Sequence, residues 1–201
     1  GLPWTPANAA QNVMLRPERL RKPLSWREPR MVFVNSMSDL FHELVPAEYV
    51  LEVFDVMRRC TYNGGSNLGR LGRGHTFQVL TKRPERMAEV VARLRFDPDA
   101  GLSLDGPGRQ YTDPQIWLGT SVENDRWTVR ADRLRETPAA VRFLSCEPLL
   151  GPQPRAELDG ELRVVQVARP VEEVDLDEHP PRILERRPHA DAHRGRQGLP
   201  R

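Results

Sequence analysis

The chain has 201 residues, enough for one substantial core, and its 30 Lys and Arg nearly balance 28 Asp and Glu, so its charge neither requires nor excludes a nucleic-acid partner. No apolar stretch approaches the roughly 18–20 residues that span a bilayer, and the two cysteines, Cys60 and Cys146, have neither a disulfide nor a metal-binding spacing. We therefore expect a cytoplasmic protein with reduced thiols, no membrane span and no metal site. A hydrophobic fraction of 38% with 19 prolines indicates that part of the chain does not pack.

Residues 1–30 combine two tryptophans, several prolines and a basic cluster. The basic residues are Arg16, Arg19, Arg21, Lys22, Arg27 and Arg30. Repeated X-Pro steps argue against a long helix here. The composition predicts a solvated basic lead-in, with a phosphate-binding arm as the alternative.

Residues 31–168 contain four short apolar runs, and each ends in a hydroxyl or amide residue followed closely by a charge. The runs are 31–34, 75–80, 116–120 and 141–144, with a weaker fifth run at 162–168. Their length and their β-branched and aromatic content predict strands buried on both faces.

Amphipathic segments separate these runs. Pro46 and Pro84 each suit the first turn of a helix. The apolar positions expected to face a sheet are Val50, Val53, Phe54 and Met57 in the first helix, Met87, Val90, Val91 and Leu94 in the second, and Trp127, Ala131 and Leu134 in a third that Ser121 or Asn124 would cap. The segment 97–114, rich in Gly, Pro and Asp, is predicted to be an irregular loop.

This alternation predicts an α/β protein whose parallel strands are joined by helical crossovers. The β-α units are too few to close an eight-stranded barrel, so the sheet is expected to be small and open or to form an incomplete TIM-type barrel. We expect three parts: the lead-in 1–30, the β-α domain 31–168 and a tail 169–201, rich in charge and proline, that is disordered.

Parallel strands gather their carboxyl ends at one edge of a sheet, where α/β proteins bind ligands. The candidate residues at this edge are Asn35, Ser36, Asp39, His42, Thr81, Lys82, Arg83, Ser121, Glu123, Asn124, Ser145 and Glu147. Their mixed charges suit a polar ligand that is anionic or zwitterionic. The structural alternative is that Ser121 and Asn124 cap a helix while Arg83 and Glu147 form ion pairs at the rim.

Four blocks carry a resemblance to a known family: FVNSMSDLFH at 33–42, TFQVLTKRPERM at 76–87, WLGTSVEN at 117–124 and RFLSCEPLLG at 142–151. Together they resemble the uncharacterised phage and prophage family named after gene products thirty-seven and sixty-eight. Full-length members of that family carry an N-terminal three-cysteine motif like the iron–sulfur loop of radical S-adenosylmethionine enzymes, on a partial barrel.

The resemblance implies that an iron–sulfur cluster, S-adenosylmethionine and a substrate bind at the barrel mouth. By position it implies cofactor-binding roles for Asn35, Ser36, Asp39, Lys82, Ser121, Glu123, Ser145 and Glu147, and substrate-binding roles for His42, Arg83 and Asn124. The three cysteines are absent from this sequence and the expected late strands have no clear counterpart. We therefore expect a truncated member that cannot bind the cluster and holds no cofactor as written.

Two other functions remain open from the sequence. The first is a non-catalytic nucleic-acid-binding α/β module that uses the basic lead-in with Lys82 and Arg83. The second is a metal-independent hydrolase or transferase with Glu123 and Glu147 as an acid/base pair.

Overall fold

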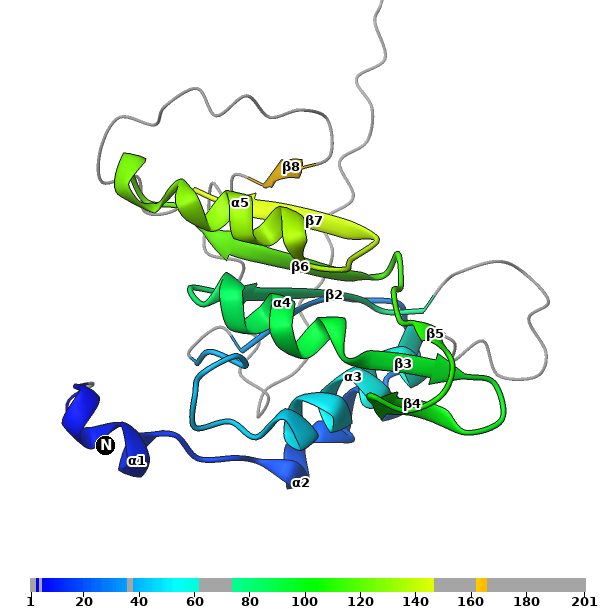
Figure 1. Ribbon diagram of the computed structural model, residues 1–201. Coiled ribbons are helices and arrows are strands. Elements are labelled where there is room, and N and C mark those ends of the chain that lie inside the picture. Colours follow the sequence, from blue (N-terminus) through cyan, green and yellow to red (C-terminus); the bar gives the residue numbers. More distant parts are fainter. Residues whose placement is uncertain (1–2, 4, 36–37, 62–73, 147–161, 166–201) are drawn as a thin grey trace, which may run out of the picture. The chain divides into compact units, whose positions relative to one another are not determined.

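The computed structural model describes residues 3, 5–35, 38–61, 74–146 and 162–165, all within one compact unit that spans residues 1–168 (Figure 1). Predictions that fall on Ser36, on Glu147 and on the tail 169–201 lie outside the described residues. In the described part, no helix is both long enough and apolar enough to cross a membrane.

The main sheet is parallel throughout. Its strands are, in spatial order, β1 (Met31–Val34), β2 (Thr76–Thr81), β6 (Ile116–Ser121) and β7 (Val141–Ser145), and β8 (Leu162–Val165) pairs with the outer side of β7. Every pairing between neighbours is parallel, and the spatial order follows the chain order. This confirms the predicted parallel sheet and the weaker fifth strand; among the described strands it stays open, with β1 and β8 at its edges.

Helices cover one face of this sheet and form the core with it. They are α3 (Ala47–Thr61), α4 (Pro84–Ala92) and α5 (Val129–Glu136). The predicted apolar positions of α3 and α4 are buried, as are Ala131 and Leu134 of α5, and they join the alternate strand residues Phe77, Val79, Leu118 and Leu144 in one cluster. In Figure 1, α4 and α5 lie side by side along β2 and β6.

The opposite face of the main sheet carries the other alternate residues. Gly119 pairs with Leu80 on one side and with Phe143 on the other, so the three share this face. The Phe143 ring lies directly over Gly119, where an added Cβ would meet ring carbons at 2.5 Å. The absence of a side chain at Gly119 therefore leaves room for the buried phenylalanine ring.

The prediction that residues 97–114 form an irregular loop was wrong, because two strands of a small antiparallel sheet lie within this segment. This sheet has the order β4 (Gly101–Leu104), β3 (Leu94–Asp97) and β5 (Arg109–Gln110). Its first turn is stabilised by the Asp97 carboxylate, which accepts hydrogen bonds at 2.9 Å from the backbone N–H groups of Asp99 and Ala100. Leu94 consequently begins β3 instead of ending α4. Strands this short, joined by Asp- and Gly-rich turns, have almost the composition of a loop.

Among its described residues the lead-in contains only short helical turns, as expected from the repeated X-Pro steps. They are η1 (Pro6–Asn8), α1 (Ala9–Asn12), α2 (Pro17–Leu20) and η2 (Lys22–Ser25). The buried ring of His75 fastens the segment to the sheet: its Nδ1 accepts from the Arg30 N–H at 3.2 Å, so Nε2 carries the proton that it shares with the Pro23 carbonyl. The ring also packs edge-on against Trp26 and Phe77.

Candidate functional site

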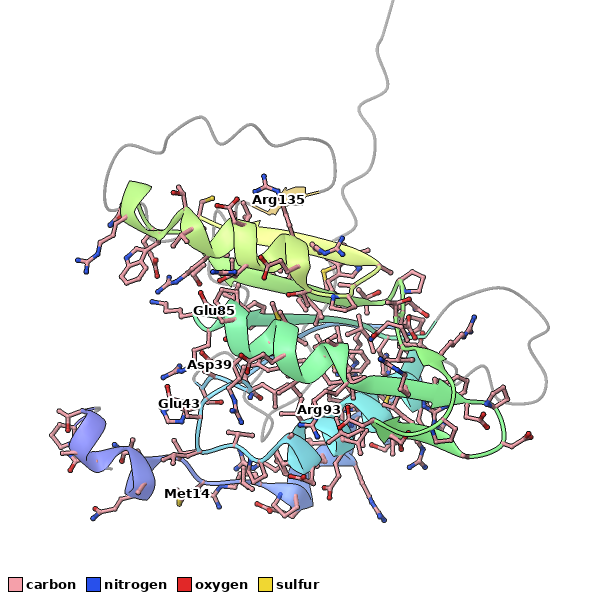
Figure 2. All side chains as sticks on the ribbon, viewed as in Figure 1. Met14, Asp39, Glu43, Glu85, Arg93 and Arg135 are labelled. Atoms are coloured by element: carbon pink, nitrogen blue, oxygen red, sulfur yellow. The ribbon has the colours of Figure 1, made fainter. Side chains whose placement is uncertain are left out.

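The carboxyl ends of β1, β2, β6 and β7 meet at one edge of the main sheet, which we call the carboxyl edge. The parallel pairing requires this, and in Figure 1 the arrowheads of β2 and β6 point the same way. Figure 2 shows Asp39, Glu43 and Glu85 at the end of the sheet where α4 begins, whereas Arg93 lies at the far end of that helix. Polar side chains that follow different strands therefore lie at the same end of the sheet.

Asp39 joins the segment after β1 to the end of β2. One carboxylate oxygen accepts from the Thr81 hydroxyl at 2.7 Å and the Phe41 N–H at 3.0 Å. The other accepts from the Arg83 guanidinium at 2.9 Å and the Lys82 N–H at 3.3 Å. Both oxygens of Asp39 are thus occupied by protein donors, so the residue positions this edge.

Glu123 lies two residues past the end of β6, and its side chain is only 6% exposed. Its Oε1 pairs with the Lys82 ammonium at 2.8 Å, and its Oε2 pairs with the Arg130 guanidinium at 3.0 Å. The two cations differ in setting, because Lys82 is 60% exposed while Arg130 is 11% exposed. Arg130 also donates to the Ser121 carbonyl at 3.0 Å and stacks on the Trp127 ring at 4.0 Å. Arg130 is therefore a fixed partner of Glu123, and Lys82 a displaceable one.

The ionisation of Glu123 depends on these cations. Burial alone would raise the pKa of its carboxyl group, because desolvation disfavours the charge. The hydrogen bond and charge of Lys82, followed by the charge of Arg130, outweigh burial and hold the pKa below its ordinary value. The edge therefore contains an ionised, water-shielded carboxylate at neutral pH.

Three polar side chains lie on the face of the sheet opposite the helices. Ser121 and Ser145 pair across β6 and β7, and Gln78 lies on the same face of β2. All three are buried, at 4%, 5% and 8% exposure, yet within the described residues their side chains make no hydrogen bond to protein. Buried polar groups are normally satisfied, so these groups are available to a ligand or to water.

Three further predicted residues, Asn35, His42 and Asn124, make local backbone interactions or adopt a special backbone conformation. Asn35 ends β1 in the left-handed region, at a φ of 60°, which asparagine tolerates better than most residues. The His42 Nδ1 accepts from the Leu44 N–H at 3.2 Å. The Asn124 side chain accepts from the Arg126 N–H at 3.1 Å, so it caps the turn η3 (Asp125–Trp127) instead of α5.

The structure brings together Asp39, Thr81, Lys82, Arg83 and Glu123 of the predicted set. Any pairing of Glu123 with Glu147 lies outside the described residues.

Sequence reasoning missed Arg130 and Gln78. Arg130 follows Trp127 by three residues, a spacing that places both on one helical face, and this could have marked it as an inward cation. Gln78 is a polar residue inside an apolar strand run, which is a comparable signal.

The cysteines do not fit an iron–sulfur cluster of the kind that the resemblance implies. The sequence has two, Cys60 on α3 and Cys146 after β7, and both side chains are buried and free. A three-thiolate cluster site needs one more ligand than the sequence contains. Within the described segments, no group of three His, Cys, Asp or Glu residues is arranged to hold a metal ion.

Searches of the curated proteins and of the solved structures returned no match. A family model does match, over residues 3–172, and its description is "Protein of unknown function (DUF5131)". This match covers nearly all of the lead-in, both sheets and every candidate residue named above. The chain therefore belongs to the uncharacterised family DUF5131.

Proposed function

We propose that the carboxyl edge of the main sheet binds S-adenosylmethionine, in a partial barrel like those of radical S-adenosylmethionine enzymes. The observation that carries the proposal is the Glu123 carboxylate, buried between an exposed ammonium and a buried guanidinium. In addition, the buried hydroxyls of Ser121 and Ser145, at the ends of the neighbouring strands β6 and β7, make no hydrogen bond within the described residues. The resemblance of the strand-end blocks supports the same ligand.

The chemistry of these groups suits a zwitterionic amino-acid ligand. Glu123 would accept hydrogen bonds from the ligand's ammonium or ribose hydroxyls, and Lys82, once displaced, would pair with its carboxylate. Ser121 and Ser145 would donate to the polar groups that remain. Bound S-adenosylmethionine supplies a carbon activated by the adjacent sulfonium, and the residues of this chain bind and orient it.

The proposal assigns no cluster to these residues, since two cysteines cannot provide three thiolates. Anaerobic reconstitution with iron and sulfide, followed by absorbance and iron counting, is expected to give far less than one four-iron cluster per chain. Near-stoichiometric cluster would refute this part of the proposal and leave the binding of S-adenosylmethionine to be judged separately.

Equilibrium binding tests the carboxyl edge directly. Isothermal titration with S-adenosylmethionine should show saturable binding, and Glu123→Gln should weaken it about tenfold or more, as expected for loss of a buried charged acceptor. The matched control is Glu136→Gln on α5, whose carboxylate pairs with Arg133 at the surface. Equal affinity of the Glu123→Gln and Glu136→Gln proteins would exclude the carboxyl edge as the binding site.

Nucleic-acid binding is the second candidate, and the lead-in favours it. Residues 16–30 contain six basic side chains and two carboxylates. Arg16 forms an ion pair with Glu18 at 3.8 Å, whereas Arg19, Arg21 and Arg27 are exposed. Lys82 and Arg83 contribute less to this function because each already pairs with a carboxylate. Affinity for an oligonucleotide should fall steeply with salt, and absence of binding at about 50 mM salt would exclude this function.

A further inference from the structure

A small cavity lies away from the carboxyl edge, between the end of α3 and the small antiparallel sheet. Its volume is about 100 Å³, and its lining residues are Arg58, Phe96, Arg109, Gln110, Tyr111 and Thr112. Three of them, Phe96, Arg109 and Gln110, belong to β3 and β5. The segment that follows β5 enters β6 from its amino end, so this cavity and the carboxyl edge are separate sites.

Two arginine side chains, Arg58 and Arg109, lie next to the Phe96 ring in the lining of the cavity. Phe96 and Arg109 are directly opposed in the antiparallel pair β3–β5, so their side chains project from the same face. From α3, the Arg58 guanidinium lies over the Phe96 ring at 5.2 Å. The Tyr111 ring packs against Phe96 at 6.3 Å, and its hydroxyl donates to the buried Asp113. Two cations thus line a space that they share with two aromatic rings and with the polar residues Gln110 and Thr112.

The hydrogen-bonding capacity of the lining is only partly used. Arg58 is held by Asp55 through its Nε and Nη2 at 3.1 and 2.7 Å, and its Nη1 makes no hydrogen bond within the described residues. The side chains of Arg109 and Thr112 are exposed and make no polar contact to any other described residue. The Gln110 side-chain amide, by contrast, already donates to the carbonyls of Val91, Leu94 and Tyr111 and accepts from the Arg95 guanidinium. Gln110 therefore holds the surrounding backbone in place. The donors that remain for a ligand are Nη1 of Arg58, the guanidinium of Arg109 and the hydroxyl of Thr112.

The lining of the cavity carries two cations and no carboxylate. Arg58 and Arg109 contribute two cations, and Asp55 is the one carboxylate that contacts a lining guanidinium in the part of the chain described. Asp113 accepts from Thr61, Tyr111 and the Gln115 N–H, so its carboxylate is satisfied behind the Tyr111 ring. Asp97 is occupied by its own turn. An anion that enters the cavity meets donors and one uncompensated cation.

From this geometry we infer that the cavity binds a phosphate-sized oxyanion, held by Arg109 with Arg58 and Thr112. A guanidinium stays charged at any physiological pH and matches the fork of two phosphate oxygens. A space of about 100 Å³ corresponds to roughly three waters at about 30 Å³ each, which suits phosphate. It is too small for a whole nucleoside, because pockets for such ligands occupy about 300–1,000 Å³.

Isothermal titration of the full chain with inorganic phosphate, at constant ionic strength against chloride, tests the inference. Arg109→Gln should weaken binding about tenfold or more, and Thr112→Val about fivefold, as expected for a charged and a neutral hydrogen bond. Arg109→Lys keeps the charge without the fork and should lie between the wild type and Arg109→Gln. The matched control is Arg93→Gln at the start of the same small sheet, where the guanidinium already pairs with Asp105 at 2.8 Å.

Two results would overturn the inference: the Arg109→Gln protein binding phosphate as well as the wild type, or the Arg93→Gln protein losing as much affinity as Arg109→Gln. Absence of phosphate binding at matched ionic strength would do the same. A short oligonucleotide without terminal phosphate distinguishes the sources of the oxyanion. Competition with phosphate that is lost in Arg109→Gln assigns the cavity to a nucleic-acid backbone, and absence of competition assigns it to free phosphate.

Discussion

Replacing Arg130 with methionine keeps a helix-forming side chain of similar length but removes the buried cation. The change deletes two hydrogen bonds of Nη1, to the Glu123 carboxylate and to the Ser121 carbonyl, each 3.0 Å long. It also ends the stacking of the guanidinium on Trp127. A hydrogen bond to a charged group contributes about 1.5–3 kcal/mol, and a cation over an indole ring about 1 kcal/mol.

The remaining partner of Glu123 limits the damage. Breaking a buried ion pair outright costs roughly 3–5 kcal/mol, because the other charge is left uncompensated. Here Lys82 still neutralises one carboxylate oxygen from the solvent side. We therefore expect Arg130→Met to lower the free energy of unfolding by about 2–4 kcal/mol.

Urea unfolding followed by circular dichroism measures this loss. The control on the same helix is Arg133→Met; the Arg133 side chain is 48% exposed and its guanidinium pairs with Glu136 at 3.1 Å. An exposed pair of this kind contributes about 0.5 kcal/mol or less. Combined with Glu123→Gln, Arg130→Met should be less destabilising than the sum of the two single changes by about 1 kcal/mol or more, because the residues contact each other. The reasoning fails if Arg130→Met and Arg133→Met unfold at the same urea concentration, or if the double variant is additive.

Three further outcomes follow from buried residues. Gly119→Ala should cost about 1–3 kcal/mol in urea unfolding, because the new methyl meets the Phe143 ring, and Phe143→Leu in that background should recover part of the loss. Burial lowers the pKa of His75 below 6.5. Its neutral form therefore stabilises the fold above that pH, and this stability is lost as the pH falls through the folded-state pKa. His75→Gln should flatten the pH dependence of the free energy of unfolding between pH 7.5 and about 5. Burial raises the pKa of the Cys60 thiol to about 11, so iodoacetamide near pH 8 should label it far more slowly in the native protein than in urea, and equal rates would contradict the burial.

The candidate site was partly predictable from the residues that end each strand. Parallel pairing makes Thr81, Lys82 and Glu123 neighbours wherever their strands lie side by side, and the structure confirms that they meet. The partners within that edge were not predictable. Whether Lys82 turns to Glu123 or to Asp39 depends on side-chain packing in space, and no sequence spacing encodes it.

The alternation of apolar runs and amphipathic helices was enough to predict a parallel sheet in chain order, because helical crossovers return each strand in the same direction. Local signals, such as Pro84 at a helix start, act over a few residues and could also be recognised in the sequence. The tertiary structure alone decided the small antiparallel sheet, since β3 becomes its central strand only when Phe96 pairs with Leu102 on one side and with Arg109 on the other. It also decided that Arg130, outwardly a surface arginine of α5, is buried against Glu123. Local propensity depends on residues that are neighbours in the sequence, whereas burial and charge pairing arise from contacts between segments that only folding brings together.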